Sequence, residues 1–225
     1  MNCNEIQAVK AVIFDLDGTL LNTLEDLQDA VNHALAEYHM PLRTLEEIRS
    51  FVGNGIDKLM ERAVPEGKAH PDFDAALACM KAYYAVHCKD KTCPYEGILP
   101  LLEELRKRGM KLAIVSNKTD AEVKVLSKEY FGDYFIASIG EMAGVDKKPA
   151  PDTALKALEE LGVSKEQAVY VGDSDVDVKT AQNAGLRNIA VTWGFRSRSF
   201  LEKQGAEEFI DSPMELLEFI PVKNA

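Results

Sequence analysis

The chain has 225 residues, of which 46% are hydrophobic and 28% are charged, and its formal net charge is −11. This length and apolar content fit one large domain or a domain that carries an insertion. The acidic balance argues against non-specific nucleic-acid binding, which needs a basic face, and it suits a protein whose site gathers a divalent cation.

Hydropathy and cysteine spacing indicate the compartment. No apolar run approaches the roughly 18 residues of a membrane-spanning helix, and residues 1–10 lack the basic, apolar and cleavage-site regions of a signal peptide. The four cysteines, which are Cys3, Cys79, Cys88 and Cys93, show no metal-ligand spacing such as C-x-x-C. We therefore expect a cytoplasmic monomer or homodimer with free thiols and no membrane partner.

Apolar runs and turn residues predict the elements in chain order. The first strand lies at residues 9–14. Helices then follow with no convincing strand between them, at 24–38, 45–51, 55–63 and 73–87. After residue 93 the two kinds of element alternate, with strands at 111–115, 134–138, 168–171, 188–192 and 209–210 and helices at 99–108, 120–130, 152–161, 175–184 and 213–219. Such alternation predicts an open, mostly parallel sheet covered on both faces.

Two carboxylates, Asp15 and Asp17, follow the first strand where it runs into a glycine turn. Desolvated like charges are costly unless a cation or a proton compensates them, so the pair indicates a bound cation and chemistry. A solvated turn is the plainer alternative, but the apolar neighbours on both sides of Asp15 disfavour it.

Three further segments, each at or near the end of a predicted element, offer a hydroxyl, a lysine and an acidic cluster: Ser116-Asn117, Lys148-Pro149 and Gly172-Asp173-Ser174-x-x-Asp177. In open parallel sheets, ligands bind at the carboxyl ends of the strands. Singly, each segment has an ordinary explanation, because Ser-Asn is common in turns and acids are favoured at a helix N-terminus. We assign Asp175 to that second cause.

These segments, together with Asp15-Leu16-Asp17-Gly18-Thr19-Leu20, resemble the four signature motifs of the haloacid dehalogenase superfamily, in that family's order. The resemblance covers almost the whole chain and is closest to the phosphoglycolate phosphatase-like branch. It implies an α/β fold in which a Rossmann-like, mostly parallel sheet is flanked by helices and carries an inserted all-helical cap domain. The expected boundaries are 1–21 and 94–225 for the core and 22–93 for the cap.

The resemblance implies a Mg²⁺-dependent phosphatase that hydrolyses a small phosphate monoester, with 2-phosphoglycolate as the favoured substrate, through an aspartyl-phosphate. Asp15 would be the nucleophile, Asp17 the general acid and then the base, and Lys148 the cation that neutralises the phosphoryl oxygens. Ser116 and Asn117 would bind phosphate oxygens. The implied metal ligands are Asp15, the Asp17 carbonyl, Asp173 and Asp177, the last directly or through water.

The segment Gly53-Asn54-Gly55 separates two predicted cap helices. From the sequence alone, a plain helix–helix turn explains it better. The resemblance implies instead that this loop meets the substrate over the core, with backbone N–H groups facing an anionic leaving group. A closed cap would then admit a compact monoester and exclude a phosphoprotein or a nucleic acid.

Other functions share these motifs. A β-phosphoglucomutase-like phosphosugar mutase would retain a bisphosphate intermediate rather than release phosphate, and a pyrophosphatase of the same superfamily would differ in substrate. A dehalogenase is disfavoured because that branch lacks the acid at the position of Asp17. A non-catalytic binding protein is disfavoured because Asp15, Lys148 and Asp173 are intact.

Overall fold

The computed structural model describes residues 8–220, so Cys3 and the tail at 222–225, which is expected to fray, lie outside the described part. The chain forms two compact units. One comprises the chain up to Leu20 and from Tyr95 onward, and the other comprises Leu21–Pro94. Within the described part, no helix has the length and apolar content that crossing a membrane requires.

The first unit contains a six-stranded sheet in the order β5-β4-β1-β6-β7-β8, and every neighbouring pair is parallel. The strands are β1 (Ala11–Phe14), β4 (Lys111–Thr119), β5 (Ala137–Glu141), β6 (Ala168–Gly172), β7 (Arg187–Val191) and β8 (Phe209–Ile210). The central strands β1 and β6 are apolar along their whole length because both faces of the sheet are covered. The predicted α/β class is therefore confirmed.

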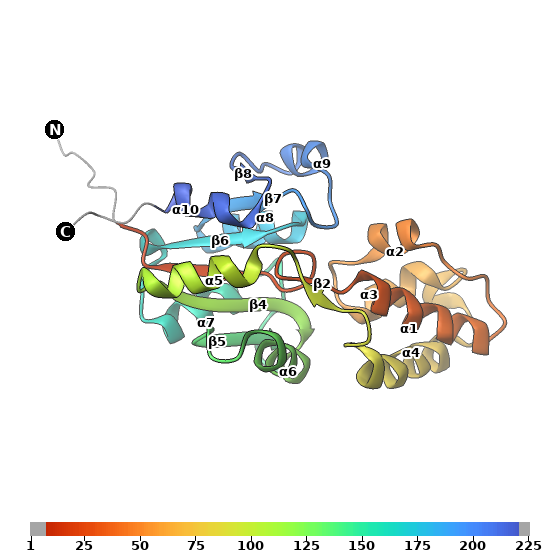
Figure 1. Cartoon of the computed structure of the whole chain (residues 1–225). Coiled ribbons are helices and arrows are strands. Elements are labelled where there is room, and N and C mark those ends of the chain that lie inside the picture. Colours follow the sequence, from red (N-terminus) through yellow and green to blue (C-terminus); the bar gives the residue numbers. More distant parts are fainter. Residues whose placement is uncertain (1–7, 221–225) are drawn as a thin grey trace. The chain divides into compact units, whose positions relative to one another are not determined.

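Helices lie on both faces of the sheet (Figure 1). α7 (Asp152–Leu161) and α8 (Asp175–Ala184) cover one face, and α5 (Ile98–Lys107) and α6 (Asp120–Phe131) cover the other. Short helices follow the last strands, at α9 (Arg198–Lys203) and α10 (Leu216–Phe219), and three-residue 3-10 helices lie at Gly67–Ala69, Lys165–Gln167 and Pro213–Glu215.

The alternation of side chains along a strand determines the face of the sheet toward which each site residue points. Ala11 and Ile13 of β1 pack with Tyr170 of β6 in the core beneath α7 and α8. Side chains two apart on a strand share a face, so Asp15 continues the row of Ala11 and Ile13 beyond the end of β1. The chain thus directs a carboxylate toward the side of the sheet on which α8 begins.

The second unit contains four helices, α1 (Leu24–Glu37), α2 (Leu45–Phe51), α3 (Ile56–Ala63) and α4 (Phe73–His87). α1 packs on α4, and their inward faces bury Val31, Met80 and Tyr84. Thr44 begins α2 with a capping box to Glu47. Among the described residues, Cys79, Cys88 and Cys93 form no disulfide.

A two-stranded antiparallel ribbon joins the ends of this unit. β2 (Leu21–Asn22) pairs with β3 (Cys93–Pro94), with Leu21 opposite Pro94 and Asn22 opposite Cys93. The next residues out continue the pairing, because the Tyr95 N–H donates to the Leu20 carbonyl at 3.1 Å. The sequence analysis placed the domain boundaries here but predicted no strand at either segment.

Three further elements differ from the prediction. The fifth strand begins at Ala137 and not at Tyr134, because the hydroxyl of Tyr134 bonds to Glu103 at 2.8 Å and the ring of Phe135 packs edge-on against Phe131. These side-chain contacts hold residues 134 and 135 outside the ladder, and the Ile136 N–H already donates to the Leu112 carbonyl of β4 at 2.9 Å. β4 continues to Thr119, with an irregular register against β5 after Val115, and α9 has no counterpart in the prediction.

Candidate active site

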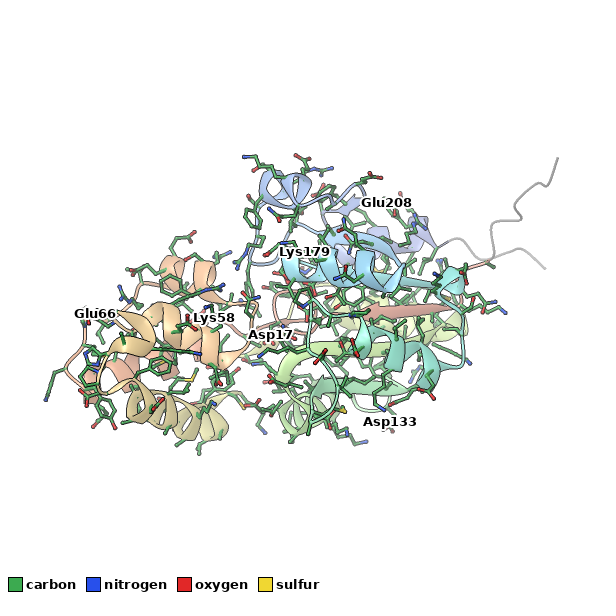
Figure 2. All side chains as sticks on the ribbon, turned by 180° about the vertical axis from the view of Figure 1, so that it is seen from behind. Asp17, Lys58, Glu66, Asp133, Lys179 and Glu208 are labelled. Carbon is green, nitrogen blue, oxygen red and sulfur yellow. The ribbon has the colours of Figure 1, made fainter. Side chains whose placement is uncertain are left out.

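The carboxyl ends of β1, β4 and β6 bring together polar side chains that are far apart in the sequence. Asp15 follows β1, Ser116 lies near the end of β4, and Asp173 follows β6. Because these three strands are adjacent and parallel, their ends meet at one edge of the sheet. Figure 2 labels Asp17 just beyond the end of β1.

Lys148 is the cation at the centre of this cluster. Its ammonium lies 2.7 Å from Asp15 Oδ1 and 2.7 Å from Asp177 Oδ1, and the residue is only 4% exposed. It also donates to the Val115 carbonyl at 3.2 Å. The neighbouring Lys147 is exposed and pairs with Glu141, so the structure brings Lys148 and not Lys147 to the predicted nucleophile.

Asp177 is fully buried, and protein donors reach both of its carboxylate oxygens. Oδ1 accepts from Lys148 and, at 3.1 Å, from the hydroxyl of Tyr170. Oδ2 accepts from the backbone N–H and the hydroxyl of Ser174 at 3.1 and 2.5 Å. A carboxylate offers about four lone-pair positions, and these four bonds use them. The geometry therefore indicates that Asp177 orients Lys148 rather than binding a metal ion directly.

Asp173 lies in a backbone cradle. Its Oδ2 accepts from the Phe195 N–H at 2.7 Å, and its Oδ1 accepts from the Thr19 hydroxyl at 3.4 Å. Gly18 and Gly194 press against the same side chain, and a Cβ at either position would overlap it. Gly18 also has φ +85°, which only glycine adopts without strain. Both glycines are therefore required where the chain packs around this carboxylate.

Two residues of β4 hold the side chain of Asp17. The Ser116 hydroxyl lies 3.5 Å from Asp17 Oδ2, and the ammonium of Lys118 lies 3.2 Å from Asp17 Oδ1. Asp17 is partly open to solvent, whereas Ser116 and Lys118 are buried. The side-chain amide of Asn117 donates to the Lys148 carbonyl at 3.0 Å, so it secures the lysine segment.

Asp175 and the loop 53–55 contact residues other than those around Lys148. Asp175 lies 3.8 Å from Arg196 and 3.9 Å from Lys179, as expected of a helix-terminal acid. In the second unit, Asn54 accepts from Arg62 at 2.8 Å. Gly55 has φ 85° and ψ 169°, a conformation that is essentially restricted to glycine. The helix–helix turn thus accounts for Gly55 by itself, and substrate binding by 53–55 stays a prediction.

Burial and neighbouring negative charges shift the pKa values of the ionisable groups in the site. Burial, followed by the charge of Asp177, raises the pKa of Asp15 well above its usual value and raises that of Asp173 to about 7. Burial acts to lower the pKa of Lys148, but Asp15 and Asp177 outweigh it and hold that pKa well above its usual value. The cluster therefore carries more negative charge than its own lysines compensate.

The donor set fits a divalent metal ion. One carboxylate oxygen from each of Asp15, Asp173 and Asp177 lies within 4.8 Å of the others. Counting Asp17, four carboxyl groups face the two ammonium groups of Lys118 and Lys148, so two negative charges are left over when all four are ionised. A hard cation with oxygen ligands would offset them. Asp15 and Asp173 are the members best placed to hold it, because protein donors already surround Asp177.

We expect the metal-free protein to lose stability as the pH rises from about 4 to about 7. The pKa of Asp173 is near 7 when folded and 3.8 without that environment, so the folded state binds the proton more tightly. The stabilisation is complete below the lower value and disappears as the pH passes the upper one. Melting temperatures in chelator at several pH values measure this. The fall should be smaller in Asp173→Asn, and equal falls would contradict the assignment.

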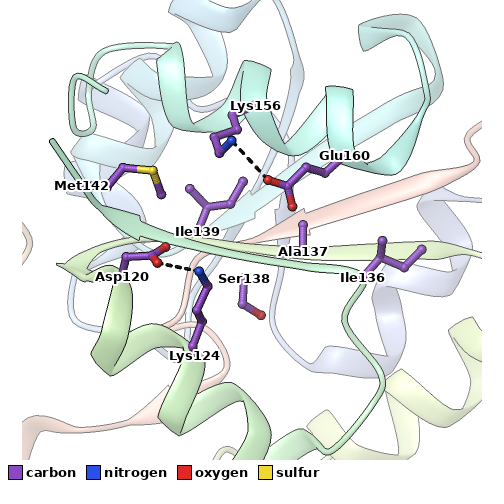
Figure 3. Close-up of a pocket in the computed structure, with 9 residues that line it drawn as sticks. All are labelled: Asp120, Lys124, Ile136, Ala137, Ser138, Ile139, Met142, Lys156 and Glu160. Carbon is purple, nitrogen blue, oxygen red and sulfur yellow. Dashed lines mark hydrogen bonds and ion pairs between the residues drawn. The ribbon is translucent and has the colours of Figure 1, made fainter. Parts of the chain in front are cut away.

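A hollow of about 250 Å³ lies away from the cluster around Asp15, at the edge strand β5 between α6 and α7 (Figure 3). Its floor includes Ile136 and Met142. Its charged side chains pair with each other, Lys124 with Asp120 at 2.6 Å and Lys156 with Glu160 at 3.4 Å. This hollow lacks the charge imbalance of the cluster around Asp15, so it is the weaker candidate for chemistry.

Comparison with known proteins agrees with this geometry. The sequence profile of the haloacid dehalogenase-like hydrolases matches residues 12–191. The phosphoglycolate phosphatase of Pseudomonas putida is 35% identical over 215 residues, covering 92% of this chain and 78% of the relative, and that of Vibrio parahaemolyticus is 31% identical over 223 residues, covering 96% and 98%. The chain belongs to the haloacid dehalogenase-like hydrolase family.

Solved structures share the fold. A protein from Lactobacillus delbrueckii subsp. bulgaricus, provisionally assigned as a phosphoglycolate phosphatase, superposes with a TM-score of 0.91 at 38% identity, covering 97% of this chain and all of that one. CbbY from Rhodobacter sphaeroides, solved in complex with phosphate, has a TM-score of 0.73 at 29% identity, covering 92% and 96%. The family resemblance predicted from the four motifs is confirmed.

The sequence analysis assigned no role to Lys118, Tyr170, Thr19 or the Phe195 N–H. Two of these carried a signal. Lys118 lies two residues after Ser116, which places both on one face of an extended strand. Tyr170 is the single polar-tipped side chain in the apolar strand Ala-Val-Tyr-Val-Gly, and a buried tyrosine hydroxyl needs a partner. Phe195 makes its contact through its backbone N–H, so the type of its side chain does not indicate it.

Proposed function

We propose that this protein is a Mg²⁺-dependent phosphatase that hydrolyses a compact phosphate monoester, with 2-phosphoglycolate as the best candidate. The observation that carries the proposal is the buried group of Asp15, Lys148 and Asp173 with Asp17 beside it. This group offers a nucleophile, a cation, an acid for metal ligation and a second, accessible carboxylate. The names of the relatives support the substrate.

Asp15 acts as the nucleophile. A carboxylate oxygen attacks phosphorus, the bond from phosphorus to the ester oxygen breaks, and an aspartyl-phosphate forms. Lys148, 2.7 Å from Asp15 Oδ1, holds the attacking group in place and offsets its charge. Asp177 and Tyr170 keep the ammonium there.

Asp17 serves both halves of the reaction. Its proton passes to the ester oxygen as the alcohol departs, and the carboxylate then takes a proton from the water that attacks the aspartyl-phosphate. The products are inorganic phosphate and regenerated Asp15. The side chain suits this role because it is more open to solvent than Asp15 yet is held by Ser116 and Lys118.

Mg²⁺ is the metal we propose, held by Asp15, Asp173 and the Asp17 carbonyl, and when bound it would offset the charge of the transferring phosphoryl group. The site suits an ion with few carboxylate ligands and several waters. Ser116 and the Asn117 N–H bind phosphate oxygens in this proposal. We propose a small-molecule substrate, as the family resemblance implies for a chain that carries the helical unit at 22–93 with the loop 53–55.

A panel of phosphate esters tests the proposal. Phosphate release should require Mg²⁺, stop with chelator, and be fastest for compact monoesters such as 2-phosphoglycolate. A phosphoprotein should be a poor substrate. Net isomerisation of a sugar phosphate with a retained bisphosphate would indicate the mutase, and preference for pyrophosphate would indicate the pyrophosphatase. Absence of phosphate release from every ester would overturn the proposal.

A further inference from the structure

We infer that Trp193 is a positioning residue for the proposed Mg²⁺ site, because its indole is bonded to the turn that follows Asp17. The inference rests on the proposed function and goes beyond it by linking metal affinity to a side chain outside the acidic cluster. Trp193 is also the single tryptophan of the chain, so its fluorescence can report on that site in the unmodified protein.

The bond of the indole joins two segments that are far apart in the sequence. Trp193 Nε1–H donates to the Thr19 carbonyl at 3.0 Å, although the two residues lie 174 positions apart. An indole offers one donor and no acceptor, so this bond uses its whole hydrogen-bonding capacity. Thr19 is fully buried, and its carbonyl lies two residues after that of Asp17, one of the proposed metal ligands. The indole therefore fixes the far end of the turn centred on Gly18.

The two residues that follow Trp193 contact the same turn and the carboxylate of Asp173. The Phe195 N–H donates to Asp173 Oδ2 at 2.7 Å. A Cβ at Gly194 would overlap both the Asp173 side chain and the Gly18 carbonyl. The three consecutive residues thus hold the turn and the carboxylate in one arrangement. Groups that orient metal ligands in this way contribute to metal affinity, and their loss weakens it.

The neighbouring side chain of the same loop has a different partner. The Thr192 hydroxyl donates to Asp211 Oδ1 at 2.6 Å and not to a residue of the turn. Trp193 is half-buried and borders a hollow of about 390 Å³, while its N–H is committed to Thr19. Removal of the indole N–H should therefore act on the turn, whereas removal of the Thr192 hydroxyl should act on the loop alone.

The first test uses the wild-type protein. Mg²⁺ binding would change the charge near the turn to which the indole is bonded, and the emission of an indole depends on such charges. With excitation selective for tryptophan, Mg²⁺ should change the emission saturably, over the same concentrations that raise the melting temperature. Asp173→Asn, which removes a proposed ligand, should lose most of this change. An emission that stays constant while the melting temperature rises would contradict the inference.

The second test removes the donor. Trp193→Phe keeps an aromatic ring but leaves the Thr19 carbonyl without this hydrogen bond, so the turn is held less tightly. We expect the dissociation constant for Mg²⁺, measured by calorimetry, to rise by about 3- to 10-fold. The Mg²⁺ concentration for half-maximal phosphate release should rise by the same factor, and saturating Mg²⁺ should restore most of the turnover.

Thr192→Val is the matched control. It removes a hydrogen bond from the adjacent position of the same loop, with little change in side-chain shape. It should lower the melting temperature of the metal-free protein and leave the affinity for Mg²⁺ unchanged. An equal loss of affinity in Thr192→Val and Trp193→Phe would overturn the inference, since affinity would then depend on loop stability in general.

The remaining outcomes separate the inference from the proposed function. Equal Mg²⁺ affinity in the wild type and Trp193→Phe would mean that the indole serves the fold alone, which overturns the inference and leaves the phosphatase standing. A wild type that binds no Mg²⁺ in calorimetry or thermal denaturation would overturn the proposed metal site itself. If Trp193→Phe does not fold, the emission titration of the wild type decides the question.

Discussion

Asp15→Asn is expected to lower the turnover of phosphate esters by at least about 10³-fold, because an amide oxygen does not replace a carboxylate as nucleophile. The fold should survive. Asparagine has the same shape, and its oxygen can still accept from Lys148, 2.7 Å away in the wild type. Burial and neighbouring acids make the wild-type carboxylate costly, so the metal-free variant should melt at the same temperature or higher. Phosphate release and thermal denaturation measure the two effects.

Asp175→Asn provides the matched control. It removes one carboxylate from the same acidic segment, but that carboxylate pairs with Arg196 and Lys179 and not with Lys148. Turnover should stay within a few-fold of the wild type. Acid quenching during turnover, followed by mass spectrometry, should find a phosphoryl group on the peptide that contains Asp15. A phosphorylated peptide elsewhere, or near wild-type turnover in Asp15→Asn, would reject the nucleophile.

Asp173→Asn is expected to abolish most of the thermal stabilisation by Mg²⁺. Ligand binding to the folded state at about 100 times its dissociation constant contributes about 2.7 kcal/mol, which corresponds to about 5–10 °C for a chain of this size. The Phe195 N–H, 2.7 Å from Oδ2, can still donate to the asparagine oxygen, so the cradle should remain intact. The metal-free variant should be at least as stable as the wild type at pH 8, because it lacks a buried charge.

Asp177→Asn distinguishes the two roles considered for that residue. If Asp177 chiefly orients Lys148, as its bonds to Lys148, Tyr170 and Ser174 indicate, the Mg²⁺-dependent shift should persist while turnover falls. Loss of the shift in Asp177→Asn but not in Asp173→Asn would place the metal differently from our proposal.

The sequence allowed the class of fold and the order of the motifs to be predicted because both follow from local patterns. Apolar runs that alternate with amphipathic helices define a parallel sheet, and parallel strands bring their carboxyl ends to one edge. Asp15, Ser116 and Asp173 follow such runs, so their meeting could be predicted without coordinates. Their roles in chemistry remain proposals until the variants are measured.

Other features depended on the path of the backbone or on side-chain packing. The choice between Lys147 and Lys148 required knowing which of them turns inward, and only a Lys-Pro motif favoured the second. The start of β5 was wrong by three residues, since a hydrogen bond of Tyr134 and the packing of Phe135 outweigh their strand propensity. The Asp177 carboxylate accepts hydrogen bonds from four donors, and the spacing of the motifs along the sequence does not reveal them.

The ribbon of β2 and β3 holds the two ends of the helical unit together, so that unit is inserted into the chain of the sheet-bearing unit at a single point. The chain leaves the sheet-bearing unit at Leu20 and returns at Tyr95, and these two residues are already joined by a 3.1 Å hydrogen bond. A tight turn could close the gap where Leu21 faces Pro94. We therefore expect that a different insert could take the place of residues 21–94 without rerouting the sheet.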